Sequence, residues 1–339
     1  MKLNTKNDVY FLMNSTTPSA ALDAAIETGL LWQLAAKPMS AREVAQALNI
    51  PAKRCCYWLQ VLDELGILQN GADGYAPSSL AREAILDVYS QDSWRHLALD
   101  ERERSAGVHN LPLLISESGS IWAAQGLAAP TDYFEKMRAS PARAREFTRM
   151  LFEVHRDMAN QIAERVDMTG IQRMIDLGGG SGVVSMALLR EYPALTSAVV
   201  DIENVCVAGR EIAEAEGLSD RISYHPADFA GGEFPAGYDL VLQCDVGVFG
   251  VALFQKIWQA LKPGGCLILV EHFSPTENYA PLTRVEWTFL DSLRDPNFSF
   301  PTLDQVRRQL VQAGFNVLPE HHTFGKGWII LQARKASAS

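Results

Sequence analysis

The chain has 339 residues, 47% of them hydrophobic and 21% charged, so it is long enough for two globular domains of ordinary composition. Its formal net charge of −10 argues against broad binding to nucleic acid or to a membrane surface, because both need basic patches. No apolar run approaches the roughly 20 residues of a membrane span, the first residues lack the apolar core of a signal peptide, and the five cysteines form no Cys-x-x-Cys pair, so we expect a cytoplasmic protein.

Residues 1–95 are expected to form helices followed by one small hairpin. Ser40 can cap a helix, and Glu43 three residues later can complete a capping box. A second helix is expected over residues 52–65, where apolar residues recur at helical spacing. Two glycines within residues 70–75 are typical of a hairpin turn. Helix, helix and hairpin in this order predict a winged-helix domain.

A winged helix can bind DNA or serve as a dimerisation module. The helix that would read DNA offers Lys53 and Arg54, but the apolar residues 55–58 follow and the acids Asp63 and Glu64 close it. Such a surface is too apolar and too mixed in charge for a major groove. We therefore expect this domain to dimerise or to pack against another part of the protein.

Residues 96–140 are expected to form a helical connection with a loose stretch at residues 116–120. A long helix is then predicted from about residue 141 to 166, because apolar residues recur there at steps of three and four. These residues are Phe147, Leu151, Val154, Met158 and Ile162. His155 flanks this stripe, where a histidine is either a structural residue or one that faces a ligand.

From residue 171 onward, short apolar runs alternate with helical patterns. Strands are expected at residues 174–177, 197–201, 222–229, 238–243, 266–271, 315–318 and 328–332. Helices are expected from residue 183, at 251–260 and at 302–313, the last with Thr302 as its cap and Gly314 after its end. The order predicts a seven-stranded, mostly parallel sheet whose last two strands form an antiparallel hairpin at the edge.

The most informative segment joins the first strand of this sheet to its first helix. Asp176 ends the strand, and Gly178, Gly180 and Gly182 precede a helix that opens at Val183. Glycines tolerate positive φ and let a backbone approach a ligand closely, and a helix N-terminus favours the polar or anionic end of that ligand. A dinucleotide fingerprint would need its third glycine at position 183, so the spacing differs from that fingerprint.

Acids end the next two strands as well. Asp201 ends the second strand, about 20 residues beyond the glycines, where a carboxylate can accept hydrogen bonds from both hydroxyls of a ribose. Asp228 and Phe229 end the third strand. Because open α/β sheets bind ligands at the carboxyl ends of their strands, these residues predict one ligand site at that edge.

The segment from Asp176 to Gly182 resembles the first motif of the class I S-adenosylmethionine-dependent methyltransferases. The resemblance implies that Asp176, the glycines and Asp201 bind this cofactor. It also implies that Asp228 accepts a hydrogen bond from the adenine amino group and that Phe229 covers the adenine ring.

The chain as a whole resembles the plant caffeic-acid type of small-molecule O-methyltransferases, with their bacterial relatives from natural-product pathways. The resemblance implies an α/β fold, in which a Rossmann-like, seven-stranded, mostly parallel methyltransferase sheet follows an N-terminal α-helical winged-helix dimerisation domain. It implies a dimerisation domain at 1–95, a helical connection that contributes to the substrate pocket at 96–168, and an S-adenosylmethionine-binding domain at 169–339. It further implies a homodimer with interlocked N-terminal domains and a small-molecule substrate.

The base of that family is missing from this chain. The family carries a His-Asp-Trp triplet after the fourth strand, four residues past a position that lines the methionine part of the cofactor. Here Cys244 falls at the cofactor-lining position, and Val248, Phe249 and Gly250 fall at the positions of the triplet. The family histidine removes the proton of the acceptor, since a neutral phenol with a pKa near 10 is a poor nucleophile at pH 7.

Several hypotheses follow from this absence. The acceptor can arrive as an anion, the methylated atom can be carbon, nitrogen or sulfur, or another side chain can act as the base. A further alternative is a member that does not methylate and instead catalyses another rearrangement or a decarboxylation. A cofactor-responsive winged-helix regulator that binds DNA is the remaining alternative.

Candidate replacements for the base lie near the predicted ligand edge of the sheet. They are His272, Glu286, His155 and Asp245. Their side chains also suit iron or zinc, but no spacing is diagnostic and we expect no metal. Aromatic residues between the fifth strand and the helix at 302–313 are expected to wall an apolar pocket. These are Phe273, Tyr279, Trp287, Phe289, Phe298 and Phe300.

Overall fold

The computed structural model of the chain describes residues 2–127, 133–227 and 234–337. The chain divides into two compact units, Met1–Arg104 and Ser105–Ser339, and the division falls inside helix α7 (Gln91–Val108). Across the described residues, no helix combines the length and the apolar character that a membrane crossing requires. The three-part division expected from the sequence stays a prediction.

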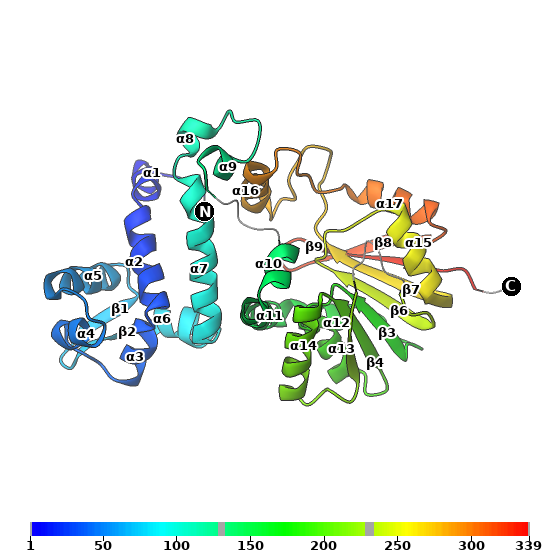
Figure 1. Cartoon of the computed structure of the whole chain (residues 1–339), viewed down its shortest axis with the longest axis horizontal. Coiled ribbons are helices and arrows are strands. Elements are labelled where there is room, and N and C mark those ends of the chain that lie inside the picture. Colours follow the sequence, from blue (N-terminus) through cyan, green and yellow to red (C-terminus); the bar gives the residue numbers. More distant parts are fainter. Residues whose placement is uncertain (1, 128–132, 228–233, 338–339) are drawn as a thin grey trace. The chain divides into compact units, whose positions relative to one another are not determined.

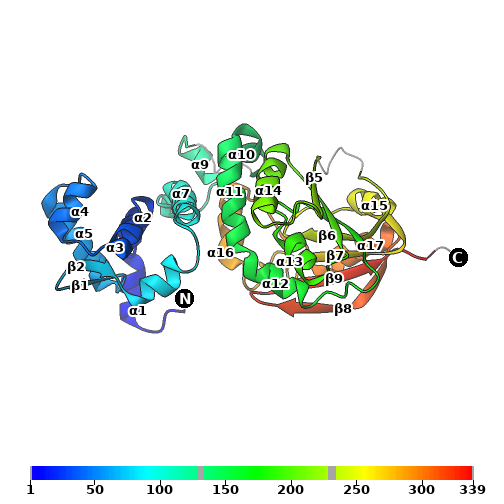
Figure 2. The ribbon, with the colours of Figure 1, turned by 90° about the horizontal axis from the view of Figure 1, so that it is seen from below.

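The N-terminal unit has the predicted winged-helix order (Figures 1 and 2). Its elements are α1 (Lys6–Met13), α2 (Thr16–Glu27), α3 (Leu30–Ala36), α4 (Ala41–Ala47), α5 (Ala52–Glu64), β1 (Leu68–Gly71), β2 (Gly74–Pro77), α6 (Ser79–Ala81) and η1 (Arg82–Leu86). The predicted capping box opens α4, because the Ser40 hydroxyl accepts from the Glu43 N–H and the Glu43 carboxylate accepts from the Ser40 N–H. Strands β1 and β2 form the predicted antiparallel hairpin.

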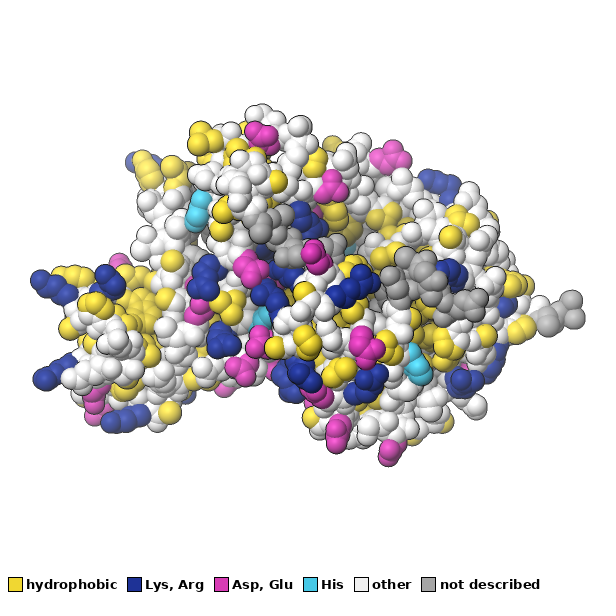
Figure 3. Space-filling view, viewed as in Figure 1, with side chains coloured by type: hydrophobic (Ala, Val, Ile, Leu, Met, Phe, Trp, Pro, Cys, Tyr) yellow, Lys and Arg dark blue, Asp and Glu magenta, His cyan; other side chains and the backbone are white. Residues whose placement is uncertain are grey.

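Apolar side chains in this unit are divided between a core and a surface. Leu34 and Leu59 are fully buried, whereas α1 buries none of its residues. The segment at residues 9–13 exposes five consecutive large apolar side chains, with Met13 at 74%. A cavity of about 860 Å³ also opens between α2 and α5, and Tyr57 is among the residues that line it. The space-filling view shows the hydrophobic area over these helices (Figure 3).

The C-terminal unit is built on a seven-stranded sheet. Its strands are β3 (Arg173–Leu177), β4 (Thr196–Asp201), β5 (Ile222–Pro226), β6 (Tyr238–Cys244), β7 (Leu261–Glu271), β8 (Asn316–Phe324) and β9 (Trp328–Arg334), in the spatial order β5-β4-β3-β6-β7-β9-β8. Strands β3 to β7 pair in parallel, and β9 runs antiparallel to both β7 and β8. The mostly parallel sheet with an antiparallel hairpin at its edge is thereby confirmed.

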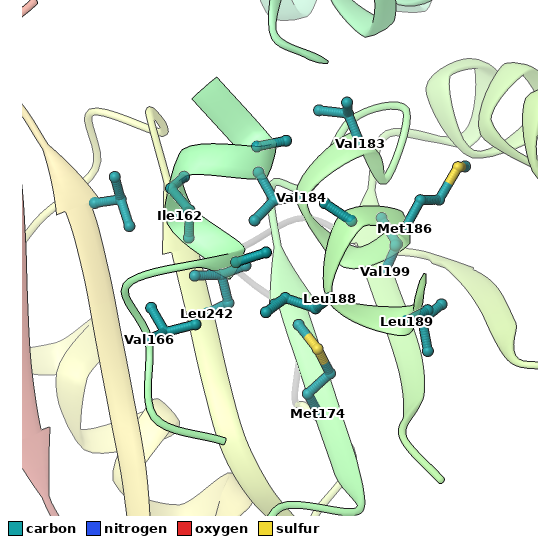
Figure 4. Close-up of a cluster of buried hydrophobic side chains, with 14 of the residues drawn as sticks. Ile162, Val166, Met174, Val183, Val184, Met186, Leu188, Leu189, Val199 and Leu242 are labelled. Atoms are coloured by element: carbon teal, nitrogen blue, oxygen red, sulfur yellow. The ribbon is translucent and has the colours of Figure 1, made fainter. Parts of the chain in front are cut away.

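Helices cover both faces of this sheet (Figures 1 and 2). They are α11 (Pro141–Val154), α12 (Arg156–Ala163), α13 (Val183–Glu191), α14 (Glu203–Ala215), α15 (Val251–Ala260) and α17 (Leu303–Gln312). Neighbouring strand residues point to opposite faces. Met174 therefore packs with the core formed by α12, α13 and α14 (Figure 4), and Ile175 with the core formed by α15 and α17. Burial on both faces explains why these strands are continuous apolar runs.

The predicted long helix from residue 141 to 166 is wrong. Helix α11 ends at Val154 and α12 begins at Arg156, with His155 between them at φ −96° and ψ 4°. The apolar stripe continues across the break, so its periodicity gave no sign of two helices. The other helices of this unit are α8 (Leu111–Leu114), α9 (Ile121–Ala124), α10 (Tyr133–Ala139) and α16 (Val285–Arg294).

Candidate active site

The glycine loop after β3 adopts the backbone that only glycine adopts easily. Gly178, Gly180 and Gly182 have φ values of +68°, +57° and +77°, as their spacing predicts. A Cβ on Gly182 would lie 2.7 Å from the hydroxyl of Tyr224, which donates to the Ser181 carbonyl at 2.7 Å. A Cβ on Gly180 would meet nothing within 4 Å. The loop is therefore held from behind while Gly180 borders open space.

The two acids at the ends of β3 and β4 lie on different sides of this loop. Asp176 is buried behind it, where its carboxylate accepts from the Ser185 hydroxyl at 2.6 Å and burial raises its pKa to about 7. Asp201 lines the cavity in front, and its carboxylate accepts from the N–H groups of Gly180 at 2.8 Å and Ile202 at 2.7 Å. Asp176 thus shapes the loop, and Asp201 is placed to meet a ligand. Asp228 and Phe229 lie outside the described residues.

A cavity of about 350 Å³ opens in front of the glycine loop. Its walls come from α10, α11, the glycine loop and the segment after β6. They include Tyr133, Phe134, Phe147, Leu151, His155, Met158, Gly178, Gly179, Gly180, Ser181, Val183, Asp201, Cys244, Asp245 and Val246. The Tyr133 and Phe147 rings lie 5.6 Å apart, and burial raises the pKa of the Tyr133 hydroxyl, with the Asp201 charge adding to the effect. The cavity therefore joins a polar loop to an aromatic wall.

Cys244 and Asp245 lie at the far side of this cavity. Burial raises the pKa of the Cys244 thiol well above its ordinary value, with nearby acids adding to the effect, so the group stays a thiol at neutral pH. Asp245 adopts a left-handed backbone with φ +53°. The next two N–H groups, of Val246 and Gly247, donate to the Glu271 carboxylate at 2.8 and 3.1 Å. Glu271, at the end of β7, thus holds the segment that presents Asp245.

Burial and the charged groups around Asp245 alter the pKa of Glu271. Burial raises the pKa of Glu271 to about 8, and the neighbouring Asp245 charge contributes. Arg284, just before α16, lies 3.4 Å from the Asp245 carboxylate and 5.3 Å from the centre of the Trp328 ring. The arginine charge opposes the rise in the pKa of Glu271. The segment after β6 therefore faces both an acid and a cation.

The two candidate histidines occupy different surroundings. His155 lines the cavity, and burial lowers its pKa, with Asp245 opposing and Arg284 adding to that effect. His272 is only 2% exposed, its ring lies 4.0 Å from the Trp328 ring, and it hydrogen-bonds the backbone of Gly327. Burial lowers the pKa of His272 to about 4. Both side chains are therefore neutral at pH 7, but only His155 borders this cavity.

The remaining candidates are dispersed. Glu286 is exposed in the first turn of α16, and the Val248 carbonyl accepts from the Gln243 amide at 2.7 Å. Phe273 is core, whereas Tyr279, Trp287 and Phe289 are largely exposed in the C-terminal unit. Within the described ranges, no three histidine, cysteine or acidic side chains lie close enough to hold a metal ion. His155, Asp245, His272 and Glu286 therefore do not meet as a ligand set.

Three residues of the site escaped the sequence analysis. Arg284, Glu271 and Tyr133 acquire their positions from tertiary contacts with Asp245 and Asp201. Only Glu271 carried a local signal, because it ends a buried strand at the ligand edge of the sheet.

Comparisons with known proteins agree with this geometry. The sequence model of the O-methyltransferase domain family matches residues 117–291, more than half of the chain. The 3-hydroxy-5-methyl-1-naphthoate 3-O-methyltransferase of Streptomyces sahachiroi is 30% identical over 229 residues, covering 65% of this chain and 62% of the relative. The L-tyrosine C(3)-methyltransferase of Streptomyces lavendulae is 31% identical over 196 residues, covering 55% and 52%. The matches thus span less than two thirds of either relative.

A solved structure extends the likeness to the whole chain. Human N-acetylserotonin methyltransferase, solved in complex with SAM, superposes with a TM-score of 0.76 and 19% identity, covering 99% of this chain and 100% of the human chain. At that identity the likeness shows the fold. Because the family's sequence model covers more than half of the sequence, the chain belongs to the O-methyltransferase family, whose members are S-adenosylmethionine-dependent methyltransferases.

Proposed function

We propose that the chain transfers a methyl group from S-adenosylmethionine to a small, largely aromatic acceptor that carries a phenol. One observation carries the proposal: a single cavity joins the glycine loop and Asp201 to the aromatic wall of Tyr133 and Phe147 and to the polar pair His155 and Asp245. The acceptors named for the two Streptomyces relatives, a hydroxynaphthoate and tyrosine, both carry a phenol. A phenolate is activated at its oxygen and at the neighbouring ring carbons, so either atom is a chemically suitable acceptor.

The residues present suit the cofactor. S-adenosylmethionine supplies a methyl group that is already activated on a sulfonium. Gly180 borders open space and so lets a ligand approach the backbone, and the Asp201 carboxylate lies beside it to accept from ribose hydroxyls. Phe134 and Phe147 line the same cavity.

We assign to His155 the role of the base that takes the proton from the acceptor. It lines the cavity beside Asp245, and its lowered pKa keeps it neutral and able to accept a proton at pH 7. We prefer His155 to His272 because the His272 side chain is buried against Trp328. The hypothesis that His272 is the base stays a prediction.

Label transfer tests the activity. The protein is incubated with methyl-labelled S-adenosylmethionine and an extract of small molecules from the source organism. Label in a small aromatic product supports methyl transfer. Conversion of a small molecule with the cofactor left intact contradicts it and supports the non-methylating alternative.

Calorimetric titration tests the cofactor site directly. Asp201→Ala is expected to weaken binding of S-adenosylhomocysteine by about 1–3 kcal/mol, because buried hydroxyl and N–H groups lose their acceptor. Glu203→Ala, an exposed acid two residues further on, is the control and should change nothing. A wild type that binds no S-adenosylhomocysteine, or an Asp201→Ala variant that binds normally, contradicts the assignment.

We also propose that the protein is a homodimer formed through its N-terminal unit. The support is the row of exposed apolar side chains on α1 together with the apolar cavity between α2 and α5. A helix that buries nothing within its own chain gains most from burial against a second copy.

A further inference from the structure

The guanidinium of Arg284 lies beside Asp245, one of the residues that line the cavity. The Nη2 atom of Arg284 is 3.4 and 3.5 Å from the two carboxylate oxygens of Asp245, which lines the cavity. The guanidinium also lies over the Trp328 ring at 5.3 Å, and 26% of the side chain is exposed. Arg284 is therefore not itself among the residues that line the cavity, but it contacts one of them and is not sealed in the core.

The contact between Arg284 and Asp245 is loose. A close charge-assisted hydrogen bond between nitrogen and a carboxylate measures about 2.7–2.9 Å, and both distances here exceed that range. Only Nη2 takes part, although a guanidinium has five N–H donors. Within the part of the chain that the structure describes, the Arg284 side chain donates its hydrogen bonds to Asp245. Each Nη nitrogen carries two hydrogens, so the second Nη2–H, together with Nε–H or an Nη1–H, is still able to receive a second planar anion.

The charges around the cavity would repel an acidic ligand if this cation did not attract it. The described residues that line the cavity include the acids Asp201 and Asp245 but no lysine or arginine. The chain as a whole carries a net charge of −10. The cavity acids and the net negative charge would both repel an anionic acceptor unless a cation bound it at the site. A phosphate ester would bring up to two negative charges close to Asp245, so a single carboxylate is the better match.

We infer that Arg284 selects the acceptor by binding a carboxylate group on it, so that the substrates are hydroxyaromatic carboxylic acids. The inference rests on the proposed function, whose acceptor it narrows. The planar fork of the guanidinium matches the two oxygens of a carboxylate, and the Trp328 ring supports the fork from one side. Arg284 is thus a specificity-determining residue that binds the carboxylate of the acceptor, away from the oxygen or carbon that receives the methyl group.

Matched acid and amide ligands test the inference. A panel of hydroxybenzoates and hydroxynaphthoates, such as 3-hydroxy-2-naphthoate, is titrated by calorimetry beside the corresponding uncharged carboxamides, with and without S-adenosylhomocysteine. At least one acid is expected to bind the wild type about 10-fold or more tightly than its amide. Arg284→Gln should abolish that preference, and Arg284→Lys, which keeps the charge without the fork, should retain part of it.

Two further variants separate this role from a structural one. Arg294→Gln removes the same charge from the other end of α16, where Arg294 pairs with Asp291 at 3.1 Å, and should leave the preference intact. Asp245→Asn removes the competing carboxylate and should strengthen acid binding.

Each outcome decides the matter. The inference is overturned if no acid of the panel binds the wild type more tightly than its amide, or if Arg284→Gln keeps the preference. If Arg284→Gln does not fold, Asp245→Asn decides, and an unchanged acid affinity there overturns the inference. If the wild type does not bind S-adenosylhomocysteine, the proposed function is contradicted instead. In that case, an acid preference that is lost in Arg284→Gln would still support the arginine contact.

Discussion

Position 248 cannot supply a base for the acceptor. Valine stands there where the caffeic-acid type carries histidine, and its carbonyl accepts a hydrogen bond from Gln243. The aliphatic side chain can neither take nor give a proton. His155, between α11 and α12, also lines the cavity, as does Asp245 of the segment after β6. Proton transfer from the acceptor is thus expected to use His155 rather than position 248.

His155→Gln is expected to lower kcat by about 10²–10⁴ with unchanged affinity for S-adenosylhomocysteine, because it removes a general base. Since burial lowers the pKa of His155 below its usual value of about 6.5, kcat should be flat around pH 7 and fall only on the acid side. Steady-state rates with the acceptor found by label transfer check this. His272→Gln in the same assay tests the rival histidine. Full activity in His155→Gln means that the acceptor arrives deprotonated.

Glu271 gives a pH dependence of stability with a definite sign. Its folded-state pKa of about 8 exceeds the ordinary glutamate value of about 4.3, so the folded chain keeps a proton that the unfolded chain has released. The unfolding free energy therefore falls as pH rises between those values. The lowered pKa values of His155 and His272 act in the opposite direction, but only below about pH 6.5.

Glu271→Gln isolates this contribution. The amide mimics the protonated acid and can still accept from the N–H groups of Val246 and Gly247. Urea unfolding at pH 6.5 and pH 8 should show a smaller loss of stability in the variant than in the wild type. An equal loss in both proteins would contradict the raised pKa.

At the scale of elements, the sequence predicted most of the C-terminal unit because the signals are local. Helix α15 has the predicted bounds, and Thr302 caps α17 with Gln305 completing a capping box. The spacing of the glycines and the acids at strand ends are visible in short stretches of sequence, and Gly180 and Asp201 line the cavity as those patterns predict. The break at His155 and the approach of Arg284 to Asp245 depend on packing between distant segments, which periodicity does not record.

Packing of α14 against β5 gives a test at the same scale. In an exposed helix, Gly→Ala stabilises by about 1 kcal/mol. A Cβ on Gly209, however, would overlap the Tyr224 ring, and overpacking costs about 1–3 kcal/mol. Gly209→Ala should therefore lower the thermal midpoint and weaken S-adenosylhomocysteine binding, because Tyr224 holds the glycine loop. Tyr224→Phe, which keeps the ring and loses the hydroxyl, is the comparison. A thermal midpoint that is unchanged or higher in Gly209→Ala contradicts the packing argument.

At the scale of the whole molecule, the dimer is the property to measure. Light scattering should give a mass of about twice the 37.4 kDa of one chain. Phe11→Asp places a charge in the exposed apolar row of α1 and should shift the mass toward the monomer. Val311→Asp, at an exposed apolar position of the C-terminal unit, is the control. A wild-type mass near that of one chain, independent of concentration, rejects the dimer.

The hydroxyl of Tyr224 links ligand binding to the margin of the sheet. Tyr224 lies on β5, an outermost strand of the sheet. Its hydroxyl nevertheless donates to the Ser181 carbonyl in the loop that follows β3, which is two strands away. Outermost strands fray more readily than central ones. By thermodynamic reciprocity, a ligand that orders the loop also opposes fraying of β5, and any change that loosens β5 lowers affinity at a site it does not touch. Affinity for the cofactor is therefore in part a property of an outermost strand.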